Sequence, residues 1–182
     1  MEQNKVSVWK ATLNPGIFLG LVLVLYSLLL YFTDQMTNKN LGYISLVIMI
    51  VGLFFGIKSF RDNARGGFLT YGQAVGAGAV ISLYAAILSA IFAYVLYAYI
   101  DPDLVQKVLE VSRDKLMEKG LSDEQIEMSM KISSKFVKPW IMSVSAIFNG
   151  VVFGTLISLI LGIFLKREGN EPFAGVTVEE GE

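Results

Sequence analysis

Four stretches of the chain contain no charged residue, and each has roughly the length of a helix that crosses a bilayer. They cover residues 11–33, 40–57, 66–100 and 139–165. About 20 mostly apolar residues are needed to span the hydrocarbon as a helix, and charged side chains are costly there. The 15 basic and 16 acidic residues accordingly lie almost wholly between the stretches. The sequence predicts an all-α integral membrane protein built as a four-helix bundle.

Each charge-free stretch holds a Gly-x-x-x-Gly pair. Small residues let helix backbones approach closely where lipid offers no hydrophobic driving force. The third and fourth stretches also carry small residues at every fourth position, which predicts that these two helices pack on each other. Packing within one chain and a homo-oligomer seam both remain open. The predicted helix-packing residues are Gly16, Gly20, Gly52, Gly56, Gly72, Gly76, Gly78, Ser82, Gly150, Gly154, Ser158 and Gly162.

Local signals set the predicted bounds of one membrane domain, residues 1–167. Asn14 is a good N-cap and Pro15 suits the first helical position, so the first helix is expected to begin there. The four spans are predicted at about 15–32, 41–57, 70–100 and 140–165. The acidic segment 168–182 is expected to be disordered.

The segment of about 102–138 is predicted to form an amphipathic helical hairpin between spans three and four. Pro102 starts its first helix, Gly120 ends that helix, and Ser122 with Gln125 matches a capping box for the second. The second helix has an apolar stripe with charged residues opposite it. The hairpin is expected either to lie on the membrane or to cap the bundle. The stripe comprises Ile126, Met130, Phe136, Val137 and Trp140.

Three cations follow the second span. If the helix continues, Lys58, Arg61 and Arg65 fall on one side of it, where they are either topology anchors or contacts for anionic lipid headgroups. Gly66 and Gly67 then stop the helix. The short loop after the first span carries one lysine. The positive charges of the short loops therefore favour cytoplasmic termini, whereas the segment 101–139, with seven basic residues, argues for the opposite orientation.

The sequence offers little chemistry. It contains no cysteine and no histidine, and its net charge is −1, so neither thiol chemistry nor nucleic-acid binding is expected. Asp101 and Asp103 flank Pro102 and indicate a helix start. Asn149 is the one carboxamide well inside a span, and it predicts an interhelical hydrogen bond. We expect a protein without catalytic activity, cofactor or metal site.

Several short motifs together resemble a known family. Leu41-Gly42-Tyr43 opens span two, and Gly67-Phe-Leu-Thr-Tyr-Gly-Gln-Ala74 leads into span three. Ile100-Asp-Pro-Asp103 closes span three, and Gly120-Leu-Ser-Asp-Glu-Gln-Ile-Glu127 lies in the hairpin. This pattern resembles the bacterial membrane-protein family called domain of unknown function 4199. The resemblance implies a four-helix protein of the bacterial inner membrane, and it implies no activity and no functional residue.

Two kinds of function agree with these features. The first is a non-catalytic scaffold, assembly or accessory subunit that acts by helix packing, with membrane lipids and either a protein partner or further copies of itself as partners. The alternative is an oligomeric channel or small-solute carrier. That alternative requires a polar path, for which the candidates are Asn149, Ser82, Ser89, Thr155 and Ser158.

Overall fold

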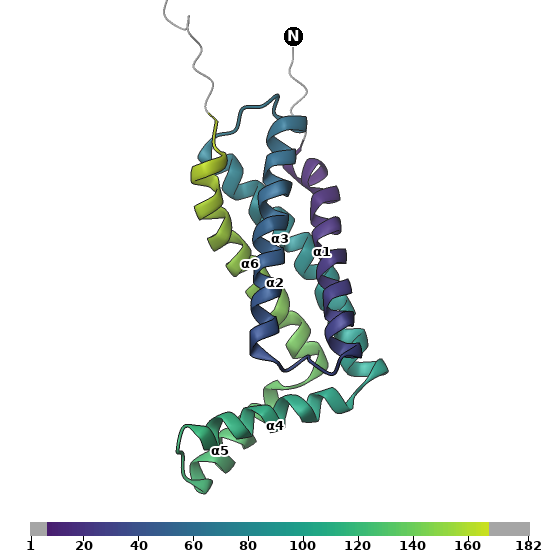
Figure 1. Cartoon of the computed structure of the whole chain (residues 1–182), viewed down its shortest axis with the longest axis vertical. Coiled ribbons are helices and arrows are strands. Elements are labelled where there is room, and N and C mark those ends of the chain that lie inside the picture. The colour runs from purple at the N-terminus through teal and green to yellow at the C-terminus, as the bar shows by residue number, and fades with distance from the viewer. Residues whose placement is uncertain (1–6, 168–182) are drawn as a thin grey trace, which may run out of the picture.

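Four long apolar helices form a bundle, and a helical hairpin projects from one end of it (Figure 1). The structure, a computed structural model, describes residues 7–167, and the predicted disordered tail lies outside this range. All four helices are long and apolar enough to cross a membrane. They are α1 (Val8–Phe32), α2 (Lys39–Ser59), α3 (Tyr71–Val95) and α6 (Pro139–Leu165). The predicted all-α membrane fold is confirmed.

Helix α3 is the centre of the bundle. It makes its most extensive contacts with α6 and α1, and α2 packs across the other three helices (Figure 1). The side chains of Leu53 and Ile57 from α2 and Ile81 from α3 are fully buried where these helices meet. The core is therefore a thin layer of aliphatic and small side chains, which suits helices that approach closely.

Helix α1 begins at Val8, seven residues before the predicted start at Pro15. Proline has no N–H to donate and usually disturbs a helix when it lies in the interior. Here the turns before Pro15 are held by tertiary contacts, since Val8 and Ala11 pack against the core. The Oγ1 atom of Thr12 also donates to the carbonyl of Val8 at 2.7 Å. These contacts keep the upstream turns helical.

The chain leaves α2 through a π-helical turn, η1 (Phe60–Ala64), and the helix then ends as predicted. Gly66 and Gly67 have φ values of +61° and +88°, which glycine adopts without strain. Thr70 then caps α3, because its hydroxyl accepts the backbone N–H of Gln73. An isolated antiparallel bridge between Leu69 and Arg167 joins the start of α3 to the end of α6.

A second π-helical turn, η2 (Leu96–Ile100), ends α3 and leads into the predicted hairpin. The hairpin consists of α4 (Asp103–Glu118) and α5 (Asp123–Phe136), and Ser122 and Gln125 form the expected capping box. It runs at a steep angle to the bundle, at the end opposite residue 167 (Figure 1). Lys107 pairs with Asp34 at 3.1 Å, and this hydrogen bond raises the pKa of Lys107.

Candidate functional site

The closest helix contact in the bundle is the α3–α6 seam, where small residues of the two antiparallel helices meet level by level. Gly78 lies against Ser158, Ser82 against Gly154, and Ala86 against Gly150. A Cβ atom added to Gly150 would lie 2.8 Å from the Cβ of Ala86, and one added to Gly154 or Gly78 would lie closer still to a serine. The two helices are therefore so close at these three positions that a side chain larger than hydrogen would collide with the facing helix.

Each serine of the seam satisfies its hydroxyl within its own helix. The Oγ of Ser82 donates to the carbonyl of Gly78 at 2.8 Å, and the Oγ of Ser158 donates to the carbonyl of Gly154 at 2.7 Å. Both side chains are buried. The hydroxyls thus cost little in an apolar interior, and they present no free donor to a ligand.

Two further glycine pairs also lie in close contacts inside the chain. A Cβ on Gly16 would come 2.7 Å from the Cβ of Tyr84 in α3, and one on Gly20 would come 3.1 Å from the backbone of Ala85. Gly52 lies against Leu19, and Gly56 lies against Ile81 and Pro15. These glycines bring α1 against α3 and α2.

Gly72 and Gly76 differ from the other predicted packing residues. An added Cβ at either position would have no neighbour within 4 Å. Gly76 comes two residues after the buried Ala74, which places it about 200° around the helix, on the outer side of α3. No contact within the described part of the chain uses this pair, and it stays exposed as a smooth strip on α3.

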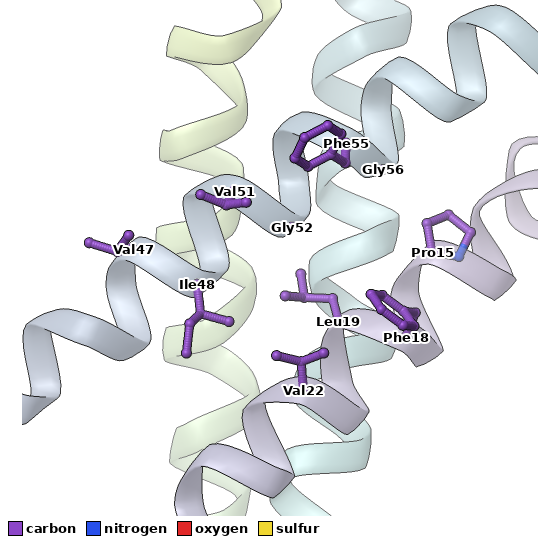
Figure 2. Close-up of a pocket in the computed structure, with 10 residues that line it drawn as sticks. All are labelled: Pro15, Phe18, Leu19, Val22, Val47, Ile48, Val51, Gly52, Phe55 and Gly56. Carbon is purple, nitrogen blue, oxygen red and sulfur yellow. The ribbon is translucent and has the colours of Figure 1, made fainter.

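An apolar groove of about 440 Å³ runs between α1 and α2 (Figure 2). Figure 2 shows its walls, which come from Phe18 and Val22 on one side and Val47 and Phe55 on the other. A hollow of about 300 Å³ with a mixed polar and apolar lining shares Pro15 with the groove, and its polar side chains are Asn14, Ser59 and Asn63.

Of the three predicted headgroup cations, Lys58 lies in α2, Arg61 lies in the π-helical turn η1 and Arg65 follows it, so the 100° spacing behind the predicted stripe does not apply through this segment. Arg61 pairs with Asp62 at 2.7 Å and lies 3.4 Å from the carbonyl of Leu165, at the end of α6. Hydrogen bonding from Arg61, with the nearby charges of Lys58 and Arg167, holds the pKa of Asp62 below its usual value. Arg65 lies over the Phe60 ring, and Lys58 stays exposed.

Asn149 does not make the predicted interhelical hydrogen bond within the chain. Its Nδ2 donates to the carbonyl of Ser145 in its own helix at 2.9 Å, and the side chain is exposed. It lies five positions before Gly154, so it points about 140° away from the α3–α6 seam. Within the described residues, its hydrogen bond is therefore intrahelical.

The hairpin carries an exposed apolar stripe that the sequence predicted only in part, since Phe136 belonged to the predicted stripe and Met128 and Ile132 did not. Met128, Ile132 and Phe136 recur every four residues on α5 and are all more than half exposed, whereas Ile126 of the predicted stripe is buried. The four-residue spacing itself was the available signal. Lys131 and Lys135 lie beside this stripe on the same helix. Apolar and basic residues arranged in this way are typical of helices that lie in a membrane surface.

Within residues 7–167, no group of three acidic residues is placed to hold a metal ion. The bundle, its apolar groove and its exposed apolar sides together define a multi-pass membrane protein of the all-α class. A family model, described as "Protein of unknown function (DUF4199)", matches residues 14–167. The chain belongs to this family, as its motifs suggested. Comparisons with curated proteins and with solved structures give no match.

Proposed function

We propose that the protein is a non-catalytic membrane scaffold, assembly or accessory subunit that acts by helix packing. The observation that carries this proposal is the exposed pair Gly72 and Gly76, which no residue of the bundle approaches. Glycine costs helix stability relative to alanine unless a close approach requires it. The other glycine pairs lie in such approaches within the chain, so this pair is left for a helix outside it.

The location proposed for this activity is the bacterial inner membrane, with both termini in the cytoplasm. The basic residues near the ends of α2 and α6 support this orientation. It places the α4–α5 hairpin outside the cytoplasm, lying on the bilayer. A thiol reagent that does not cross membranes should therefore label Ser122→Cys in spheroplasts; protection of that cysteine until the membrane is opened would reverse the orientation.

Lipids are the second proposed class of partner. The groove between α1 and α2 offers apolar walls for an acyl chain, and the hollow at Asn14 and Asn63 offers amide groups at the level of a headgroup. A lipid bound there would fill the groove between α1 and α2. Its role would be structural, since the groove is lined by apolar side chains.

The channel alternative has less support. Ser82 and Ser158 bond within their own helices, Thr155 does likewise to the carbonyl of Val151, and Asn149 points outward. A polar path needs groups that face one another across a water-filled space. Of the five candidates, Ser89 alone has a buried hydroxyl without a hydrogen-bond partner among the described residues, and one such group does not make a polar path.

Photo-crosslinking in the native membrane tests the packing proposal. Leu83 lies seven residues after Gly76, on the same side of α3, and a diazirine-bearing residue there should capture a polypeptide. Gly72→Leu with Gly76→Leu should reduce that adduct, because the two side chains hold a neighbouring helix away. A diazirine at Leu21, a lipid-facing position on α1, is the control. Adducts with lipid alone at both positions would refute the proposal.

A further inference from the structure

Asn149 is a polar side chain on an otherwise apolar, outward surface of α6. Val152 and Leu156 share that side and are both exposed. Phe148 and Phe153 stand on either side of it, with 70% and 54% of their surface exposed. Together with Ser145, one turn earlier, Asn149 therefore occupies a low strip between two bulky aromatic side chains.

The position of Asn149 along the axis of α6 decides whether its carboxamide can reach water. Asn149 is 10 residues from Pro139 and 16 from Leu165, or about 15 Å and 24 Å along the helix axis. A hydrocarbon layer about 30 Å thick, if centred on this 27-residue helix, covers the position of Asn149. The carboxamide thus lies inside the hydrocarbon, away from water and headgroups.

The hydrogen-bonding capacity of this carboxamide is only partly used. A side-chain amide has two N–H donors and a carbonyl oxygen that accepts. Among the described residues, Asn149 makes one such bond, from Nδ2 to the carbonyl of Ser145. Its Oδ1 atom and its second N–H face lipid, which offers neither donor nor acceptor. A polar group in this position requires a partner from another molecule.

We propose that Asn149 pairs with Asn149 of a second copy of this chain, across a two-fold axis, in an α6–α6 dimer. A carboxamide is complementary to itself, since each copy donates an N–H to the Oδ1 of the other. A two-fold interface places the same residue of both subunits opposite each other. The low strip lets the two α6 helices approach, with the phenylalanines packing at its edges.

This dimer surface is separate from the strip formed by Gly72 and Gly76 on α3, so the inference does not depend on the proposed function. It also differs from the α3–α6 seam, which is filled within the chain. The dimer therefore leaves both the fold and the other proposed surface unchanged.

Disulfide trapping tests the dimer directly, because the chain has no cysteine of its own. Val152→Cys, expressed in the native membrane and oxidised, should form a covalent dimer. Leu21→Cys, which is lipid-facing at mid-helix on α1, should not. Adding Asn149→Leu to Val152→Cys should lower the trapped fraction about five-fold, because the symmetric pair of interhelical hydrogen bonds, together worth about 1 kcal/mol, is lost. Asn149→Gln retains the carboxamide and should preserve most of the trapping.

Folding is a small concern for these variants, since Asn149 touches no other helix through a hydrogen bond. Unchanged helix content by circular dichroism should accompany Asn149→Leu. Equal disulfide-trapped fractions for Val152→Cys and Leu21→Cys would refute the proposed dimer. A trapped fraction that Asn149→Leu does not change would refute it too. Asn149-dependent capture of a different polypeptide would overturn it as well, because it would assign this surface to a foreign helix.

Discussion

Gly154→Leu is expected to abolish the folded bundle or to lower its unfolding temperature by about 10 °C. The leucine side chain would have to occupy the space of Ser82, and the Cε of Met49 lies only 2.9 Å from the new Cβ. Overpacking in a close-packed interior costs about 1–3 kcal/mol and occasionally more, and each kcal/mol moves the melting temperature of a domain of this size by about 2–4 °C. Thermal unfolding in a mild detergent measures the effect.

A size exchange across the seam is the sharpest control for this prediction. Ser82→Gly combined with Gly154→Ser exchanges the serine and the glycine that face each other across the seam, so the total side-chain volume stays the same. The new serine can donate to the carbonyl of Gly150, four residues earlier, as Ser158 now does to Gly154. The double variant should therefore be clearly more stable than Gly154→Ser alone. Equal stability of the two would contradict the contact between these positions.

Gly16→Leu is expected to separate α1 from α3, with a loss of stability similar to that of the seam variant. A Cβ at this position would lie 2.7 Å from the Cβ of Tyr84 and 3.2 Å from the carbonyl oxygen of Ile81, which is backbone and cannot move aside cheaply. Tyr84 also contacts Trp9 edge-on, with ring centroids 6.2 Å apart, and donates to the carbonyl of Trp9. Trp9 therefore reports on this contact.

Fluorescence measures the separation once Trp140→Phe leaves Trp9 as the single tryptophan. Gly16→Leu should shift the Trp9 emission and lower the melting temperature, because the Tyr84 contact is lost. Gly42→Leu provides the control, since no atom lies within 4 Å of a Cβ added there. A Gly16→Leu variant with the emission and stability of Gly42→Leu would show that α1 does not approach α3 at this point.

The fold was predictable from sequence because its main signals are local. The charge-free stretches fix the number of helices, and turn chemistry fixes several of their ends. Gly66 and Gly67 stop the helical segment that continues α2 through η1, and Ser122 with Gln125 starts α5, each through backbone conformations or hydrogen bonds that involve only nearby residues. The four-residue spacing of small residues likewise placed α3 beside α6.

The rotation of each helix about its own axis was less predictable, because it depends on all neighbours at once. The Gly-x-x-x-Gly pattern is the same for Gly150 with Gly154 as for Gly72 with Gly76, yet only the first pair meets another helix in this chain. Asn149 is one residue from Gly150 and nevertheless faces outward. The groove combines residues of two helices, so no single segment shows it.

The remaining differences come from backbone details that tertiary contacts decide. Proline is favoured in the first turn of a helix, but core contacts of Val8 and Ala11 extend α1 upstream of Pro15. The π-helical turn after Ser59 changes the angular spacing of Arg61 and Arg65, which bind within the chain. A local pattern does not contain these contacts.

Native mass spectrometry of the protein extracted with its surrounding lipid tests the central claim, that this protein acts by packing against other helices. We expect a species heavier than one chain, containing a second copy or another polypeptide. That species should be reduced by Gly72→Leu with Gly76→Leu or by Asn149→Leu, whichever surface forms the contact. A single chain carrying only lipid, for the wild type and for every variant, would show that the protein does not pack against other helices.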